Sequence, residues 1–144
     1  MAVNTPIFIL DTSAILAYVQ EEPGAQRVYS LLIEAKAKRC RISISFATIS
    51  EVYYIICQKQ GPPPARELVA LLKELPIEIV QSNERITLAA GRLKAAYRLS
   101  FADAFIAATA MEKEGVLVHK DPEFELIRPS VATEALPYKK RFSK

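Results

Sequence analysis

The sequence predicts an α/β fold, a three-layer α/β/α sandwich with a mainly parallel central sheet. Residues 7–10 (Ile-Phe-Ile-Leu) are four consecutive bulky apolar residues, typical of a parallel strand buried on both faces. Strand-like runs alternate with amphipathic helical stretches along the chain, the order that builds a parallel sheet covered by helices. With 144 residues, 51% of them hydrophobic, and no repeat or linker, we expect one domain over residues 1–144.

Apolar spacing and local turn signals place the elements in order. Four-residue to five-residue runs predict strands at residues 7–10, 41–45, 77–80 and 116–119, with a last edge strand beginning near Ile127. Apolar residues recurring every three to four positions predict helices at 14–19, 25–38, 48–60, 65–75, 84–98 and 101–114.

Some of these elements carry additional local expectations. The polar–apolar alternation of residues 41–45 is typical of a strand near a sheet edge. Pro62 to Pro64 suit the first turn of a helix, and Gly115 is the expected cap of the helix ending at residue 114. Residues 137–144 are expected to be a basic tail.

The net charge of +3 implies little, but the basic residues are concentrated at positions 36–41, 92–98 and 139–144. Such clusters suit a polyanion, and solvated helix ends or a frayed tail explain them equally well. Cys40 and Cys57 form no CxxC motif, which favours reduced thiols in the cytoplasm. No apolar run approaches the ~20 residues that a membrane helix needs, so we expect a cytoplasmic chain without membrane contact.

Four acids are expected near one edge of the sheet: Asp11 and Asp121 follow strands, and Glu51 and Asp103 lie near helix starts. Taken singly, each is explained by capping, a turn or a solvated helix face. However, Asp103 begins a helix that is apolar almost all round, and neither it nor Glu51 has a lysine or arginine one turn away. Four unpaired carboxylates close together would repel one another unless a divalent cation neutralised them.

Carboxylate oxygens without cysteine or histidine partners suit Mg²⁺ or Mn²⁺ better than zinc. A cation held in this way can activate water and stabilise the charge that develops on a phosphodiester. The residues therefore predict metal-dependent phosphodiester hydrolysis.

The ordered motifs resemble those of the PIN-domain ribonucleases, and are most similar to the VapC toxins of VapBC toxin–antitoxin modules. The segments that carry the resemblance are Ile9–Ala14, Ser50–Val52, Ser100–Ala108 and Asp121–Phe124. The resemblance implies a small α/β/α sandwich, usually a homodimer, that cleaves RNA with Mg²⁺ or Mn²⁺. It also implies a VapB-like antitoxin partner that wraps the toxin and blocks its acidic pocket.

By the same resemblance, Asp11, Glu51 and Asp103 are the principal metal ligands, and Asp121 completes the acidic cluster. Ser13 matches a family hydroxyl that supports the first carboxylate or a bound water molecule. We count these five residues as catalytic, and expect lysines and arginines at 36–41 and 92–98 to hold the RNA backbone.

The chain departs from the family pattern at His119, where the family often has threonine two residues before the last aspartate. The departure bears on the order of the loop around Asp121. His119 either ends a strand, the interpretation we favour, or assists proton transfer near neutral pH.

Two other enzyme classes fit the residues less well. A phosphatase with an aspartate nucleophile usually has a second acid where this chain has Ser13, and RNase H-like nucleases begin with hairpins rather than a strand–helix step. A catalytically silent PIN-like module that binds RNA or protein, or a housekeeping RNA-processing nuclease, is the alternative to a toxin.

Overall fold

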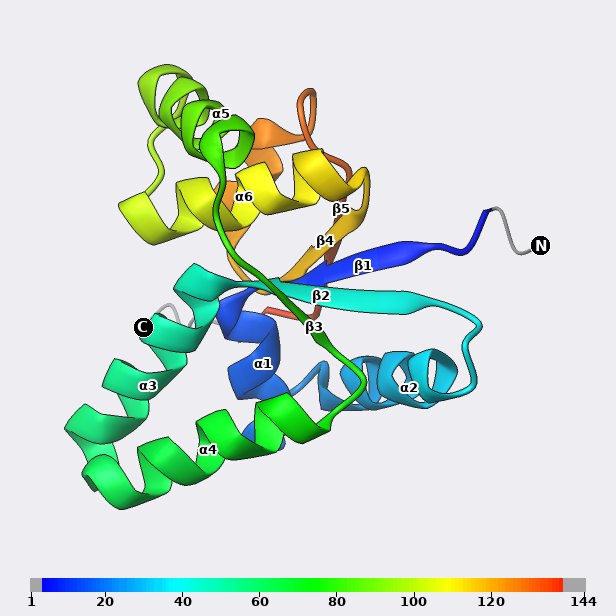
Figure 1. Ribbon diagram of the computed structural model, residues 1–144, viewed down its shortest axis with the longest axis vertical. Coiled ribbons are helices and arrows are strands. Elements are labelled where there is room, and N and C mark those ends of the chain that lie inside the picture. The colour runs from blue at the N-terminus through cyan, green and yellow to red at the C-terminus, as the bar shows by residue number, and fades with distance from the viewer. Residues whose placement is uncertain (1–3, 139–144) are drawn as a thin grey trace, which may run out of the picture.

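The computed structural model describes residues 4–138 and contains a five-stranded parallel sheet between two helical layers (Figure 1). The strands are β1 (Ile7–Leu10), β2 (Arg41–Ser45), β3 (Glu78–Val80), β4 (Val116–His119) and β5 (Thr133–Ala135). Their order is β3-β2-β1-β4-β5, and all four pairings are parallel. The predicted α/β/α sandwich is confirmed. Most of the expected basic tail, residues 139–144, lies outside the described residues.

Four helices cover one face of the sheet, and two helices and a 3₁₀ helix cover the other (Figure 1). The first group is α1 (Thr12–Val19), α2 (Ala25–Lys36), α3 (Phe46–Gln60) and α4 (Pro62–Glu74). The second is α5 (Glu84–Ala96), α6 (Phe101–Lys113) and the 3₁₀ helix η1 (Pro122–Ile127). No helix among residues 4–138 is both long and apolar enough to cross a bilayer.

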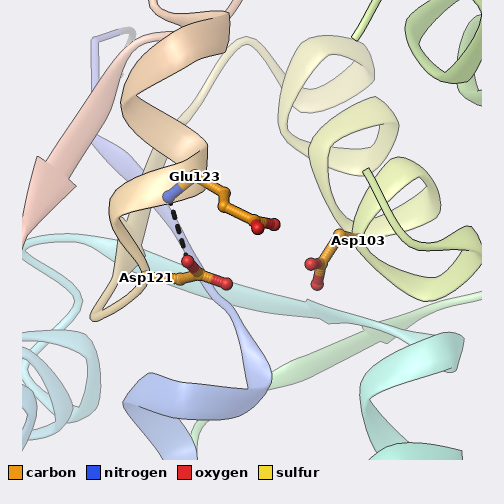
Figure 2. A group of neighbouring side chains, drawn as sticks. All are labelled: Asp103, Asp121 and Glu123. Atoms are coloured by element: carbon orange, nitrogen blue, oxygen red, sulfur yellow. Dashed lines mark hydrogen bonds between the residues drawn. The ribbon is translucent and has the colours of Figure 1, made fainter. Parts of the chain in front are cut away.

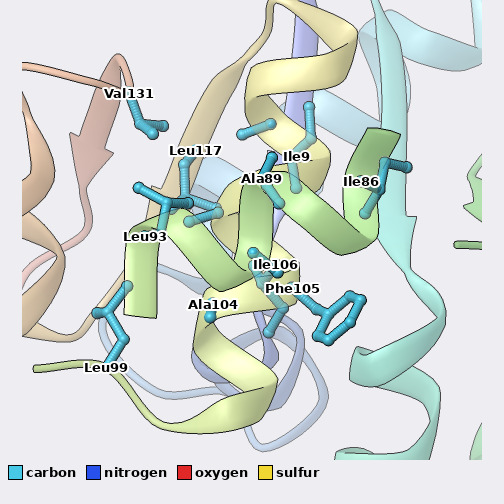
Figure 3. Packing of buried hydrophobic residues seen from close by; sticks show 14 of the residues in the cluster. Ile9, Ile86, Ala89, Leu93, Leu99, Ala104, Phe105, Ile106, Leu117 and Val131 are labelled. Atoms are coloured by element: carbon cyan, nitrogen blue, oxygen red, sulfur yellow. The ribbon is translucent and has the colours of Figure 1, made fainter. Parts of the chain in front are cut away.

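The central strand β1 separates two hydrophobic cores. Ile9 packs with Ile106 and Leu117 beneath α5 and α6, as Figure 3 shows, whereas Leu10 packs with the α1–α4 layer. Successive strand residues point to opposite faces, so both side chains have 0% exposure. The burial of β1 on both faces fixes Asp11, the next residue, at the carboxyl edge of the sheet.

The expected strand near a sheet edge is confirmed: β2 lies directly inside the edge strand β3, between it and β1. Arg41 is exposed, whereas the other two polar residues of the alternation are buried serines with hydrogen-bond partners. Ser43 Oγ donates to Glu78, and Ser45 Oγ accepts from the Ala47 N–H as the N-cap of α3. The last edge strand is β5, and Ile127 ends the 3₁₀ helix η1 instead of beginning a strand.

The end of α6 also differs from the expectation. Glu114, with φ of 53°, is the left-handed C-cap, and its N–H bonds to the Ala110 carbonyl. A Cβ at Gly115 would lie 2.6 Å from Ile9 Cδ1 and 2.8 Å from the Ile7 carbonyl oxygen. The lack of a side chain at Gly115 is therefore required by the close approach of the β4 start to β1. Its N–H also takes part in the helix cap, because it donates to the Ala110 carbonyl at 3.0 Å.

Candidate metal centre at the carboxyl edge of the sheet

Asp11 is the N-cap of α1 and is almost completely buried, with 3% exposure. Its Oδ1 accepts the Ala14 N–H at 2.7 Å, so the capping role expected of this residue is real. Ser13 Oγ lies 2.8 Å from both carboxylate oxygens and also accepts the Lys120 N–H at 2.9 Å. Ser13 therefore lies against the first carboxylate, where it was expected, and also links α1 to the loop that follows β4.

Glu51 reaches the start of α1 from the second turn of α3. Thr12 Oγ1 donates to Glu51 Oε1 at 2.5 Å, across 39 residues of sequence. This hydroxyl, which the sequence interpretation did not select, connects the carboxylate of α3 to the residue beside Asp11.

Three carboxylates form a tight group: Asp103, Asp121 and Glu123 each offer an oxygen, and these oxygens lie within 4.8 Å of one another (Figure 2). Asp103 lies in the first turn of α6, whose N-cap Ser100 accepts the Asp103 N–H at 3.0 Å. Asp121 and Glu123 come from the turn between β4 and η1 and point toward Asp103 (Figure 2). Asp121 also caps η1, because its Oδ1 accepts the Glu123 N–H at 2.9 Å.

Two of the four predicted metal ligands, Asp103 and Asp121, belong to this group, whereas Asp11 and Glu51 lie outside it and are bound by neighbouring hydroxyls. Sequence reasoning missed Glu123. Its signal was Pro122, which favours the start of a helix and so places Glu123 in the first turn, directly after the cap at Asp121.

The acids nevertheless interact as one electrostatic unit. Burial, with smaller contributions from the charges of Asp103 and Asp121, raises the pKa of Asp11 to about 7. Burial, followed by the charges of Glu51, Asp121 and Glu123, raises the pKa of Asp103 to about 6. Among residues 4–138, no ion pair neutralises any of the five acids. The prediction of clustered carboxylates without basic partners agrees with this geometry, although Asp103 is only partly buried.

His119 ends β4 with 0% exposure, and both ring nitrogens bond within the same loop, to Glu125 and to the Asp121 N–H. Burial lowers the pKa of His119, which favours the neutral imidazole. This environment suits the strand-ending interpretation better than proton transfer.

The basic clusters lie at different edges of the sheet. Residues 36–41 connect the end of α2 to the start of β2. They therefore lie at the amino edge of the sheet, opposite the acids. Residues 92–98 lead from the end of α5 toward the first turn of α6, which carries Asp103. The third cluster, at 139–144, lies outside the described residues.

Together, these features define a parallel α/β/α protein with an acidic centre at the carboxyl edge of its sheet. A family model described as "PIN domain" matches residues 8–128, so the chain belongs to the PIN domain family.

Solved structures share the fold at low sequence identity. A chain of VapBC2 from Rickettsia felis, bound to a promoter DNA fragment, is 20% identical with a TM-score of 0.75, covering 91% of this chain and 99% of its own. DNA-bound VapBC from Salmonella typhimurium is 21% identical with a TM-score of 0.72, covering 90% and 98%. VapC20 from Mycobacterium tuberculosis, a sarcin-ricin loop cleaving toxin, is 17% identical with a TM-score of 0.65, covering 83% and 93%. A search of curated proteins found no match.

Proposed function

We propose that this PIN domain is an endoribonuclease that hydrolyses RNA phosphodiester bonds with Mg²⁺ or Mn²⁺. The observation that carries the proposal is the group of Asp103, Asp121 and Glu123, whose oxygens converge within 4.8 Å without a lysine or arginine partner. Asp11 and Glu51 add negative charge to the same edge.

The donor set fits a hard divalent cation. All the converging atoms are carboxylate oxygens, which Mg²⁺ and Mn²⁺ prefer, and no cysteine belongs to the group. The capping bond of Asp121 uses Oδ1 and leaves its second oxygen for a ligand. When bound, the cation would lower the pKa of a water molecule and offset the negative charge of the phosphodiester.

The neighbouring residues would prepare the site. Ser13 donates a hydrogen bond to Asp11, which favours the ionised carboxylate that a cation needs. Thr12 donates to Glu51, which holds that carboxylate toward the start of α1. The basic residues at 92–98 would contact RNA phosphates near Asp103, because they lie on the segment that leads into α6.

Within this function, we place the protein as the toxin of a toxin–antitoxin pair that acts in the cytoplasm as a homodimer. Two similar structures are described as VapBC complexes, and a third as a toxin that cleaves the sarcin-ricin loop. Cys40 and Cys57 are free thiols, as in a reducing compartment. Co-expression with the product of the adjacent gene, followed by purification of a stoichiometric complex that does not cut RNA, would support the antitoxin.

The direct test is cleavage of a structured RNA mixture by purified wild-type and Asp103→Asn protein, with Mg²⁺, Mn²⁺ or EDTA. Metal-dependent cutting that the variant lacks would support the nuclease. RNA binding without cutting in any lane would favour the silent module instead. If the variant cuts as well as the wild type, the assignment of the site is wrong.

A further inference from the structure

The turn that carries Asp121 and Glu123 is held by side chains that accept its backbone N–H groups. Lys120 N–H donates to Ser13 Oγ at 2.9 Å, and Asp121 N–H donates to His119 Nδ1 at 3.0 Å. Glu123 N–H then donates to Asp121 Oδ1 at 2.9 Å. The last two bonds each join a side chain to the N–H two residues on, which is the geometry of an Asx turn.

The first of these two turns requires one particular tautomer of His119. A neutral imidazole has one donor and one acceptor, so a ring that accepts the Asp121 N–H at Nδ1 carries its proton on Nε2. Nε2 lies 2.8 Å from Glu125 Oε2, and this carboxylate oxygen can accept a hydrogen bond from the Nε2–H. Arg128 holds the other Glu125 oxygen at 3.3 Å, and the ring packs on Phe124 with 5.3 Å between centroids.

We propose that His119 is a positioning residue for the candidate metal centre: its Nδ1 fixes the backbone at Asp121, and Glu125 selects the tautomer that leaves Nδ1 free to accept. Both ring nitrogens are occupied in this arrangement, so His119 does not touch the reacting atoms. The effect on metal binding rests on the proposed function, whereas the tautomer and the order of the turn do not. Neighbours that orient metal ligands typically account for about 10–100-fold in metal affinity or activity.

The tautomer can be measured directly, because His119 is the only histidine in the sequence. Protein labelled with ¹⁵N-histidine, studied by NMR without metal, is expected to show an unprotonated Nδ1 and a protonated Nε2. Coupling across the hydrogen bond from the Asp121 amide to Nδ1 is also expected. A proton on Nδ1 would overturn the proposal, since such a ring cannot accept the Asp121 N–H.

Two substitutions then separate positioning from simple filling of space. His119→Asn keeps an acceptor, Oδ1, at the position of Nδ1 but does not reach Glu125. His119→Gln can reach toward Glu125 but has no acceptor at that position. We expect Gln to weaken Mn²⁺ binding by about tenfold or more and Asn by about threefold or less. The Asp121 amide should exchange with solvent faster in Gln than in Asn.

Calorimetric Mn²⁺ titration, amide exchange and thermal unfolding are measured on both variants. The contrary outcome is that both variants lose the same Mn²⁺ affinity and the same protection of the Asp121 amide, in proportion to their loss of thermal stability. That result would show that His119 only fills the core, and would overturn the proposal. A third outcome is that neither the wild type nor either variant binds Mn²⁺, while the Asp121 amide is protected in the wild type and in His119→Asn but not in His119→Gln. In that case the proposed function fails and the positioning of the turn holds.

Discussion

The two edges of the sheet treat charge in opposite ways. At the amino edge, Arg39 pairs with Glu34 at 2.6 Å and Lys113 with Glu78 at 3.2 Å. These are exposed or partly exposed pairs of the kind that contributes little to stability. At the carboxyl edge, the acids gather around Asp103 without a basic partner among the described residues, and their mutual repulsion works against folding.

Pairing, and not the number of charges, distinguishes the candidate site from the rest of the surface. The net charge of +3 does not reveal this difference, because it adds the paired charges of the amino edge to the unpaired acids of the carboxyl edge. Unneutralised carboxylates that lower stability are the arrangement expected where a cation is bound.

The largest expected effect comes from removing one carboxylate charge at the carboxyl edge, compared with the removal of one at the amino edge. Asp103→Asn should reduce RNA cleavage by about 100-fold or more, because it removes an oxygen ligand from the tight group. The fold should persist, since the side chain is only partly buried and its repulsion with neighbouring acids is relieved. Glu78→Gln at the amino edge is the matched control. If both variants keep wild-type cleavage rates and thermal stability, the edges do not differ in function.

The next effect is the pH dependence of the metal-free protein. Burial raises the pKa of Asp11 from 3.8 to about 7, so the folded state binds more protons than the unfolded state between these values. The free energy of unfolding should therefore fall as pH rises from about 4 to about 7. Asp11→Asn should be more stable than wild type at pH 8 by a few kcal/mol, with the difference shrinking toward pH 4.

Urea unfolding in EDTA at several pH values measures this difference, and Mg²⁺ added at pH 8 should stabilise the wild type more than the variant. A variant less stable than the wild type at pH 8 would show that the ionised Asp11 carboxylate is well solvated or paired, contrary to the electrostatics described above.

The smallest effect concerns RNA. Arg98→Ala, on the segment before α6, should weaken RNA binding several-fold and lower the slope of log affinity against log salt by about 0.7–0.9 for one lost phosphate contact. Arg39→Ala, at the amino edge, should change neither value because Arg39 is far along the strands from the acids and already paired. Fluorescence anisotropy with labelled RNA distinguishes the two. Equal losses would place the RNA path across both edges.

The sequence was most informative where local chemistry decides the structure. The apolar run before Asp11 and the strand that ends at His119 are both present as expected. The motifs also indicated four candidate acids, because these residues follow strands or lie near the starts of helices.

The remaining features depend on contacts between distant segments. Whether Ser43 faces solvent or a partner depends on β3 lying beside β2, which no local pattern encodes. The Thr12–Glu51 bond likewise requires α1 and α3 to meet. The separation of the basic clusters between two edges follows from the strand directions, and could be assigned only with the topology known.

The most direct test of the central claim is a crystal structure of the protein soaked in Mn²⁺, with anomalous scattering recorded to locate the ion. A metal centre predicts an anomalous peak among the oxygens of Asp103, Asp121 and Glu123, absent in Asp103→Asn crystals. No peak at this edge in well-ordered wild-type crystals with the acids accessible and ionised, or a peak only elsewhere, would contradict it.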